Sequence, residues 1–419
     1  MKQLRLSRVL SVLTVTAAAA CALLPASAAF AQYDFTLIMS NLDNPRGLAI
    51  GPDGGVYVTE AGRGGNGTTV TTGDGSAQSF GTTSGVSRFL GGVQSRVLSG
   101  APSLAVTTLN GVPAPGNDAS GLQDITFVGG QAYGLIGLGG NPAIRNSFTA
   151  TENASGARFL GHLVTLSLDG SNTITSVADV SAYEAANNPA GGNTGDDVNS
   201  NPHSLVARPG GGFAVTDAGG NDVLNVSAGG GVSTISVLPA RTFGPFTYQS
   251  VPTGITLGPD GSYYFTELTG FPFPAGAANI YRYNPITNQT SIAYTGFTNL
   301  LDVAFAPDGS LYALQLNTNG ILGNPPFSGP AGPGVLTRID TLGNRTNISS
   351  PSFNLSNPTA LAIGADGAIY VSNQGSSAGT GQVIRITATA PEPGSLPLLA
   401  GGLLSLVGVV QLRRRRGAK

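Results

Sequence analysis

Short apolar strands separated by tight turns recur along the chain, and the first copy spans Asn44–Gly62. Apolar residues of Leu48–Ile50 and Val56–Val58 flank the turn Gly-Pro-Asp-Gly-Gly at 51–55. Proline presets φ for the first turn position, and glycine supplies the positive φ that returns the chain. The copy therefore predicts a β-hairpin. Because its strands are apolar on both faces, other sheets must cover both sides.

Five further copies follow, and counting them predicts the architecture. The second copy departs from the pattern, which leaves its register open. The copies lie at 121–136, 201–217, 251–267, 301–314 and 357–373. A third strand-like run follows each hairpin, and most copies have a fourth. Four antiparallel strands in each of six repeats, without helical periodicity, predict an all-β fold, a six-bladed β-propeller.

The last copy lacks an outer strand, because only 387–390 remain after its third strand at Val383–Ile386. A spare strand at Asp34–Ser40 is expected to fill that place and close the last blade. A seven-bladed ring is the alternative, because 99–117 and 178–201 are long enough to contain strands. The insertions, rich in Gly, Asn, Ser and Pro, are predicted to be loops; they lie at 64–84, 139–158, 185–200 and 317–334.

Composition agrees with this fold and narrows the choice of partner. Glycine accounts for 62 of 419 residues and only 10% are charged, as suits many short strands and turns. The body from Gln32 to Ala390 has 12 Arg, no Lys and 21 Asp plus Glu, a formal net charge of −9. An acidic body without lysine argues against a phosphate-backbone partner, so we expect no nucleic-acid binding.

The N-terminus predicts export. Residues 1–31 combine a basic start, an apolar run and small residues, as in a secretory signal peptide. Cleavage is expected after Ala29-Phe30-Ala31, with Ala26-Ser27-Ala28 as the alternative. The only cysteine, Cys21, lies in this segment, so the mature body can contain neither a disulfide nor a thiol nucleophile.

The C-terminal residues 391–419 form a second targeting segment. Pro391, Glu392 and Pro393 precede an apolar run from Leu396 to Leu412, long enough to just span a bilayer as a transmembrane helix. A basic cluster follows at Arg413, Arg414, Arg415 and Arg416. An ordinary tail anchor is one interpretation. The order of features closely resembles the PEP-CTERM sorting signal of Gram-negative bacteria, which implies transient inner-membrane anchoring, cleavage by an exosortase and a link to exopolysaccharide.

The body from 32 to 390 resembles NHL-type and lyase-type propellers in its repeated Pro-Asp-Gly hairpins. More closely, Leu42–Ala49 with Glu60–Gly65 resembles the ScyD/ScyE family of secreted bacterial propellers. This resemblance covers most of 35–386 and is strongest in the first blade. It implies a six-bladed propeller but no established catalytic residues.

Polar residues at the blade entries and at the exits of the second strands are the candidate site. Both sets are expected on one face, around the central channel. Arg46 and His203 are candidate ligand residues at the entries, and His203 is a weak candidate for a general base. Glu60, Asp217, Glu267 and Asn373 end second strands and could form a ring of oxygen donors for Ca²⁺ or another divalent metal. Capping of their own turns is the alternative interpretation. His162 lies in a strand pattern and receives no role.

Two functions remain open at this level, and whether the protein is an enzyme is undecided. The first is an exported binding or scaffold propeller that engages exopolysaccharide or surface proteins, located in the cell envelope or outside the cell. The second is a metal-dependent hydrolase or lyase with its site in the channel, similar to the lactonase and virginiamycin-lyase propellers.

Overall fold

The computed structural model describes residues 33–389, apart from 110, 192–197, 324–329 and 351–352. Residues Asp34–Thr387 form one compact unit. The predicted signal peptide at 1–31 and sorting segment at 391–419 lie outside the described residues. No helix in the described part is long and apolar enough to cross a membrane, and the predicted span at Leu396–Leu412 is not within that part.

The described chain is mostly β-structure, and six of its sheets contain four or more strands. The first sheet runs β2 (Pro45–Ile50), β3 (Val56–Glu60), β5 (Ala77–Leu90), β6 (Val93–Leu109), β7 (Val112–Ser120), with β4 (Thr69–Thr71) paired to β5. The second contains β8 (Leu122–Val128), β9 (Gln131–Ile136), β10 (His162–Leu166) and β11 (Ile174–Asp179). The third contains β12 (Pro202–Ala207), β13 (Phe213–Asp217), β14 (Asp222–Val226) and β15 (Val232–Val237).

The second half of the chain continues the series. The fourth sheet contains β18 (Pro252–Leu257), β19 (Tyr263–Glu267), β20 (Ala278–Asn284) and β21 (Gln289–Phe297). The fifth contains β22 (Leu300–Phe305), β23 (Leu311–Gln315), β24 (Val335–Ile339) and β25 (Arg345–Ile348). The last contains β26 (Ala360–Ile363), β27 (Ile369–Asn373), β28 (Gly381–Ala388) and β1 (Tyr33–Leu42). A separate hairpin pairs β16 (Arg241–Phe243) with β17 (Phe246–Tyr248).

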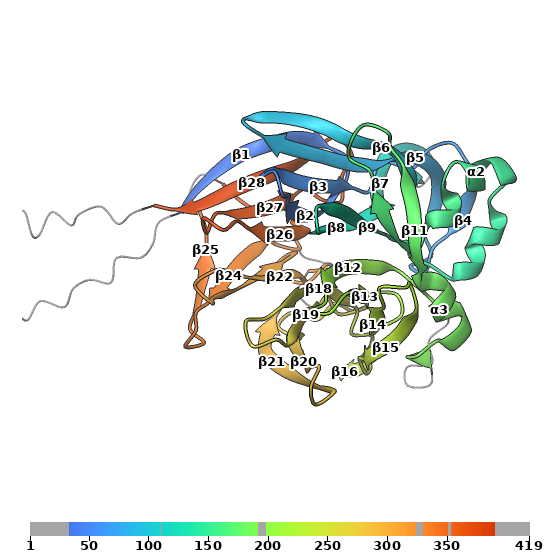
Figure 1. Cartoon of the computed structure of the whole chain (residues 1–419). Helices are drawn as coiled ribbons and strands as arrows, with labels where there is room; N and C mark the ends of the chain where they lie inside the picture. The colour runs from blue at the N-terminus through green and yellow to red at the C-terminus, as the bar shows by residue number, and fades with distance from the viewer. Residues whose placement is uncertain (1–32, 110, 192–197, 324–329, 351–352, 390–419) are drawn as a thin grey trace, which may run out of the picture. The chain divides into compact units, whose positions relative to one another are not determined.

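The first strand of each hairpin repeat lies at the centre. These strands contact one another in the order β2, β8, β12, β18, β22, β26, and β26 contacts β2 again. Figure 1 shows their labels grouped around the middle of the domain, with β1, β11, β15, β21 and β25 toward its edge. Sheets of four strands arranged in this way are consistent with a β-propeller.

The N-terminal strand lies where the sequence predicts it. The last sheet has the order β1-β28-β27-β26, so β1 is its outermost strand and joins both ends of the described chain. Met39 and Leu42 on β1 are each only 1% exposed and pack with Leu48 and Val58 of the first sheet. Strand β1 therefore contributes to the core between the last and first sheets.

Two of the insertions predicted to be loops, 64–84 and 139–158, contain regular structure, which corrects that prediction, whereas the described residues of 317–334 have no helix or strand. The segment 64–84 contains β4 and the start of β5. The segment 99–117, long enough to contain strands, adds the end of β6 and most of β7 to the first sheet. Helices occupy parts of 139–158 and 178–201: η1 (Pro142–Ser147), α2 (Ala150–Ala154), η2 (Ala157–Phe159) and α3 (Val180–Asn187). These helices are too short for a periodic signal; α2 depends on a capping box between Thr149 and Glu152.

Candidate functional site at the central channel

A β-bulge at the start of the inner strands directs side chains into the channel. In the first hairpin Pro45 lies opposite Glu60, but the next registered pair is Leu48 with Val58, and β8, β12, β18 and β22 show the same shift. A bulge bends its strand and changes the direction of the extra side chain. The residues at this position from the six inner strands or their entries all line one cavity: Arg46, Gln123, His203, Thr253, Leu301 and Thr359.

This cavity, which we call the cup, has a volume of about 720 Å³. Most of its charged, amide and imidazole side chains come from the first three sheets and their connections: Arg46, Asp74, Gln78, Asp118, Gln123, Asn199, Asn201 and His203. The later part of the chain adds the polar residues Gln249, Thr253, Thr359 and Ser376. Its large apolar side chains come from a later part of the chain: Val251, Leu268, Phe271, Phe273, Leu301 and Leu316. The cup is large enough for a small organic ligand, and it offers hydrogen-bonding groups and aromatic surface together.

The structure brings the two predicted ligand residues, Arg46 and His203, together in the cup. The Arg46 guanidinium donates hydrogen bonds to the carbonyl oxygens of Gly375 and Ala119, which fix its position between the last and first sheets. Burial lowers the pKa of Arg46 to about 10 despite the opposing charge of Asp118, so Arg46 remains a cation at neutral pH.

Burial, assisted by the positive charge of Arg46, lowers the pKa of His203 to about 4. The imidazole is therefore neutral at pH 7. Its Nδ1 atom is buried and has no hydrogen-bond partner among the described residues. A neutral imidazole with an unused nitrogen can accept a proton or a hydrogen bond from a ligand.

A narrow layer with two carboxylates lies next to this ring. It is lined by Gly47, Asp124, Ser204, Gly254, Asp302 and Ala360, the residues that follow the six channel positions. Its cavity of about 10 Å³ has room for roughly one water molecule. Asp124 accepts hydrogen bonds from Ser204 Oγ at 2.7 Å and from the Leu205 N–H at 2.9 Å, and Asp302 accepts one from the Leu361 N–H at 2.8 Å.

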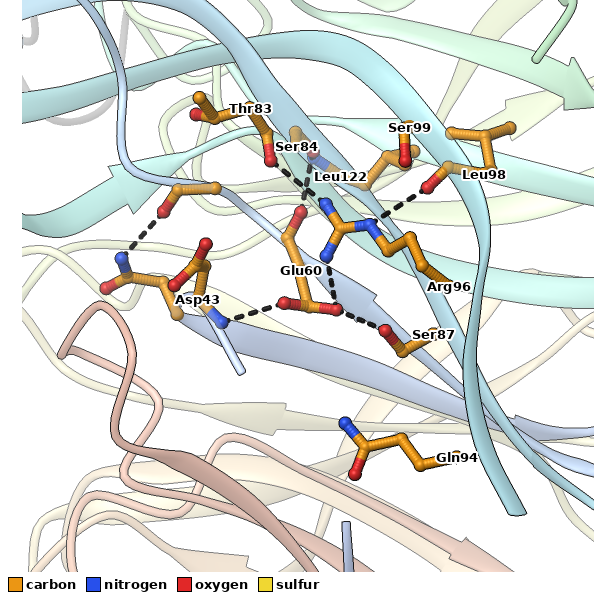
Figure 2. Close-up of polar contacts among 12 residues, drawn as sticks. Asp43, Glu60, Thr83, Ser84, Ser87, Gln94, Arg96, Leu98, Ser99 and Leu122 are labelled. Carbon is orange, nitrogen blue, oxygen red and sulfur yellow. Dashed lines mark hydrogen bonds and ion pairs between the residues drawn. The ribbon is translucent and has the colours of Figure 1, made fainter. Parts of the chain in front are cut away.

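The predicted ring of metal ligands is not assembled, because each side chain bonds within its own sheet or blade entry. Glu60 accepts from the Asp43 N–H at 2.8 Å and Ser87 Oγ at 2.6 Å, and pairs with Arg96 at 2.5 Å (Figure 2). Asp217 accepts from Ser200 Oγ and the Asn201 N–H, both at 2.6 Å. Buried carboxylates take these donors because their oxygens would otherwise lack partners.

Glu267 and Asn373 also bond within their own sheet or its entry. Glu267 pairs with Arg241 and accepts from the Asn279 N–H at 3.0 Å, whereas Asn373 accepts from the Ser356 N–H at 2.7 Å. Gln315, at the equivalent place in the fifth sheet, accepts from the Thr298 N–H at 2.8 Å. The capping interpretation therefore describes these positions. In the part of the chain that the structure describes, no group of three or more His, Cys, Asp or Glu could hold a metal ion.

Several cup residues were missed at the sequence level. Gln123, Leu301 and Thr359 occupy the same slot as Arg46 and His203, so aligning all six copies at their entries would have found them. His162 lies outside the cup: its Nε2 is 3.2 Å from Asp179, which also pairs with Arg145, and its Nδ1 contacts Ser176. These contacts fasten the end of β11 to β10 and η1.

Comparison with known proteins gives likenesses of structure only. No protein-family model matches the sequence, and no curated protein matches it. A protein of unknown function from Bacteroides thetaiotaomicron is 8% identical with a TM-score of 0.50, over 85% of this chain and 76% of the other. A streptogramin B lyase is 14% identical with a TM-score of 0.46, over 87% of this chain and all of the other.

A third similar structure is a calcium-binding protein, regucalcin, from Agrobacterium tumefaciens. It is 11% identical with a TM-score of 0.46, over 84% of this chain and 94% of the other. At these identities the likeness concerns the fold and not the activity.

Proposed function

We propose that the protein is an exported binding protein that holds a small, saccharide-type ligand in the cup. The observation that carries this proposal is that one cup combines charged and amide side chains, most of them from the first three sheets, with large apolar side chains from the later part of the chain. A sugar ring presents hydroxyl groups at its edge and C–H groups on its faces. The hydroxyl groups can form hydrogen bonds with the carboxylate, amide and guanidinium groups of the cup, and the C–H faces can pack on its aromatic rings.

The aromatic side of the cup is built from a small cluster. Phe271 lies edge-on to Phe246 of β17, with ring centroids 5.7 Å apart, and edge-on to Phe273 at 6.4 Å. Phe271 is 57% exposed although it is a large apolar side chain. An exposed aromatic ring beside a cavity is typical of a ligand contact.

Calorimetric titration of the purified chain with a panel of neutral and acidic di- to hexasaccharides tests the proposal. At least one of them is expected to bind, and both Asp118→Asn and Phe271→Ala are expected to weaken it by about tenfold or more, the loss of about 1.4 kcal/mol. Leu342→Ala is the control, because Leu342 is an exposed apolar residue that does not line the cup, and it should leave the affinity for the saccharide unchanged. Failure of every saccharide to bind, or equal binding by Phe271→Ala and wild type, would overturn the proposal.

Catalysis in the cup is the second candidate, and His203 carries it. A neutral imidazole with an unpartnered Nδ1 beside the Arg46 cation can remove a proton from a ligand whose developing negative charge Arg46 stabilises. The described residues do not fit a channel metal, because the four candidate ligands are engaged elsewhere, so no step is assigned to one. Hydrolysis of a model aryl lactone by wild type, lost in His203→Gln, would support this candidate; equal turnover by both would exclude His203.

We further propose that the ring has six blades of the ScyD/ScyE type, closed by β1, and that residues 391–419 act as a PEP-CTERM signal. Export, inner-membrane anchoring of the precursor and cleavage by an exosortase near Pro391–Pro393 would deliver the binding domain to the cell envelope or the medium, where exopolysaccharide or surface proteins are available. Mass spectrometry of the protein from exosortase-positive and exosortase-deficient strains checks this. Cleavage in the first strain alone is expected, and an uncleaved C-terminus in both would contradict it.

A further inference from the structure

Three buried carboxylates meet at the turn between β13 and β14, outside the cup. Glu184 lies on α3, Asp217 ends β13 and Asp222 begins β14. All three are at most 1% exposed. Among the described residues, none of the three takes part in an ion pair. Buried negative charges without a cation are costly, so this place needs a compensating charge.

The three carboxylates differ in how their oxygens are used. Asp217 is fully engaged, because besides Ser200 and Asn201 it accepts the N–H groups of Gly219 and Gly220 at 3.0 Å. Both side-chain oxygens of Asp222 and Oε2 of Glu184 are buried and have no hydrogen-bond partner in the described part of the chain. Orphaned buried oxygens are rare in folded proteins and require an explanation.

The free oxygens face a common point, which Gly220 leaves open. A methyl group placed on Gly220 would lie 3.2 Å from Glu184 Oε2 and 3.3 Å from Asp222 Oδ1. The same point is 3.4 Å from Cγ of Asp217, whose oxygens turn toward the N–H groups named above. Gly220 does not have a positive φ, so the backbone itself does not require glycine there. The glycine instead keeps a space, which we call the cradle, free beside the unpartnered oxygens of Glu184 and Asp222.

We propose that Glu184 and Asp222 bind a hard cation, Ca²⁺, in this cradle, with the charge of Asp217 adding to the attraction. The donors are all oxygen, which Ca²⁺ prefers, and Ca²⁺ accepts the irregular geometry that two carboxylates, backbone carbonyls and waters provide. The ion would fasten α3 to the β13–β14 turn.

This site is distinct from the predicted ring of Glu60, Asp217, Glu267 and Asn373. Only Glu184 and Asp222 have free oxygens at the cradle. The remaining ligands of the ion would be backbone carbonyls and water. It also does not depend on the ligand of the cup, so its test is independent of the proposed function.

Equilibrium dialysis of the purified, chelator-treated chain against Ca²⁺ tests the proposal, together with thermal melting. Wild type is expected to bind one equivalent and to gain several degrees in Tm on adding Ca²⁺. Asp222→Asn, Glu184→Gln and Gly220→Ala should each weaken binding by at least about tenfold, the first two by removing charge and the third by filling the cradle. Asp366→Asn, at an exposed turn carboxylate of the last sheet, is the matched control and should bind as wild type does.

Folding of the variants is controlled by melting in chelator alone. There Asp222→Asn is expected to melt at or above the wild-type temperature, because the change relieves repulsion between buried like charges. Absence of bound Ca²⁺ in wild type, or unchanged binding in all three variants, would overturn the proposal. In that event the carboxyl groups hold protons instead, and wild-type stability would depend on pH but not on Ca²⁺.

Discussion

Asp302 accepts a hydrogen bond from the backbone N–H of Leu361 at 2.8 Å, and this contact joins the inner strand β22 of the fifth sheet to β26 of the last. Asp124 makes the equivalent contact with Leu205 at 2.9 Å, joining β8 to β12. The preceding strands carry Gly47 and Gly254 against these carboxylates: a methyl group there would lie 2.2 Å from Asp124 Oδ1 and 2.3 Å from Asp302 Oδ1. The channel thus repeats one arrangement in its two halves.

The stability of the protein is expected to fall as pH rises from about 6.5 to about 8, whereas at lower pH the depressed pKa of His203 acts in the opposite direction. Burial, together with the charge of Asp124, raises the pKa of Asp302 from 3.8 to about 8. Within this range the native state keeps a proton that the unfolded state has released, so the free energy of unfolding decreases with rising pH. Burial also raises the pKa of Asp124 to about 6 and, with the charge of Asp217, that of Glu184 to about 7, in the same direction.

Denaturant unfolding across this pH range, in chelator, measures the effect. Asp302→Asn should reduce the slope, because asparagine cannot titrate. Asp308→Asn is the control: a hydrogen bond from the Ser310 N–H helps to lower the pKa of Asp308, so its titration lies below the range. A slope that is the same in wild type and Asp302→Asn would contradict the assignment.

The Glu60–Arg96 pair is expected to be a structural element of the first sheet. Glu60 is 2% exposed, and removing its carboxylate in Glu60→Ala leaves the Asp43 N–H and the Ser87 hydroxyl without this acceptor and Arg96 without its counter-ion (Figure 2). The expected loss in free energy of unfolding is about 3 kcal/mol. The more exposed pair of Arg88 with Asp53 provides a comparison: Arg88→Ala should cost less than about 1 kcal/mol. Equal losses in the two variants would argue against this role.

The packing of β1 on the core predicts different effects for substitutions at its buried and its exposed side chains. Met39→Ala should lower the free energy of unfolding by about 2–5 kcal/mol, because it opens a cavity between the last and first sheets. Leu37→Ala on the same strand should change it by less than about 0.5 kcal/mol, because Leu37 is 50% exposed. Thermal and denaturant unfolding measure both, and similar effects at the two positions would show that β1 does not pack as described.

Much of the fold could be predicted from the sequence, because each hairpin carries its own signal. The turn Gly-Pro-Asp-Gly and the apolar runs around it are local features, and they locate β2 and β3 without knowledge of the other sheets. The place of β1 followed from counting strands. The pairing of β7 with β6 and the helix α3 could not be predicted, because their sequences lack periodicity and their stability depends on packing against distant segments.

The candidate site was predictable only in part. Arg46 and His203 stood out because they differ chemically from other copies at the same slot. The orientation of Glu60 and Asp217 could not be inferred, since it depends on donors such as Ser87 and Ser200 that the hairpin pattern does not include. The cluster of Glu184 with Asp222 could not be predicted either, because Glu184 lies on the inserted helix α3 and Asp222 begins β14, and no sequence pattern places these two elements together.

A crystal structure of the purified chain grown with the saccharide that binds most tightly in the titration tests the central claim most directly. The account predicts the sugar in the cup, with its ring face on Phe271 and its hydroxyl groups within hydrogen-bond distance of Asp118 or His203. A sugar bound only on the outer strands of the sheets, with the cup filled by solvent, would contradict it.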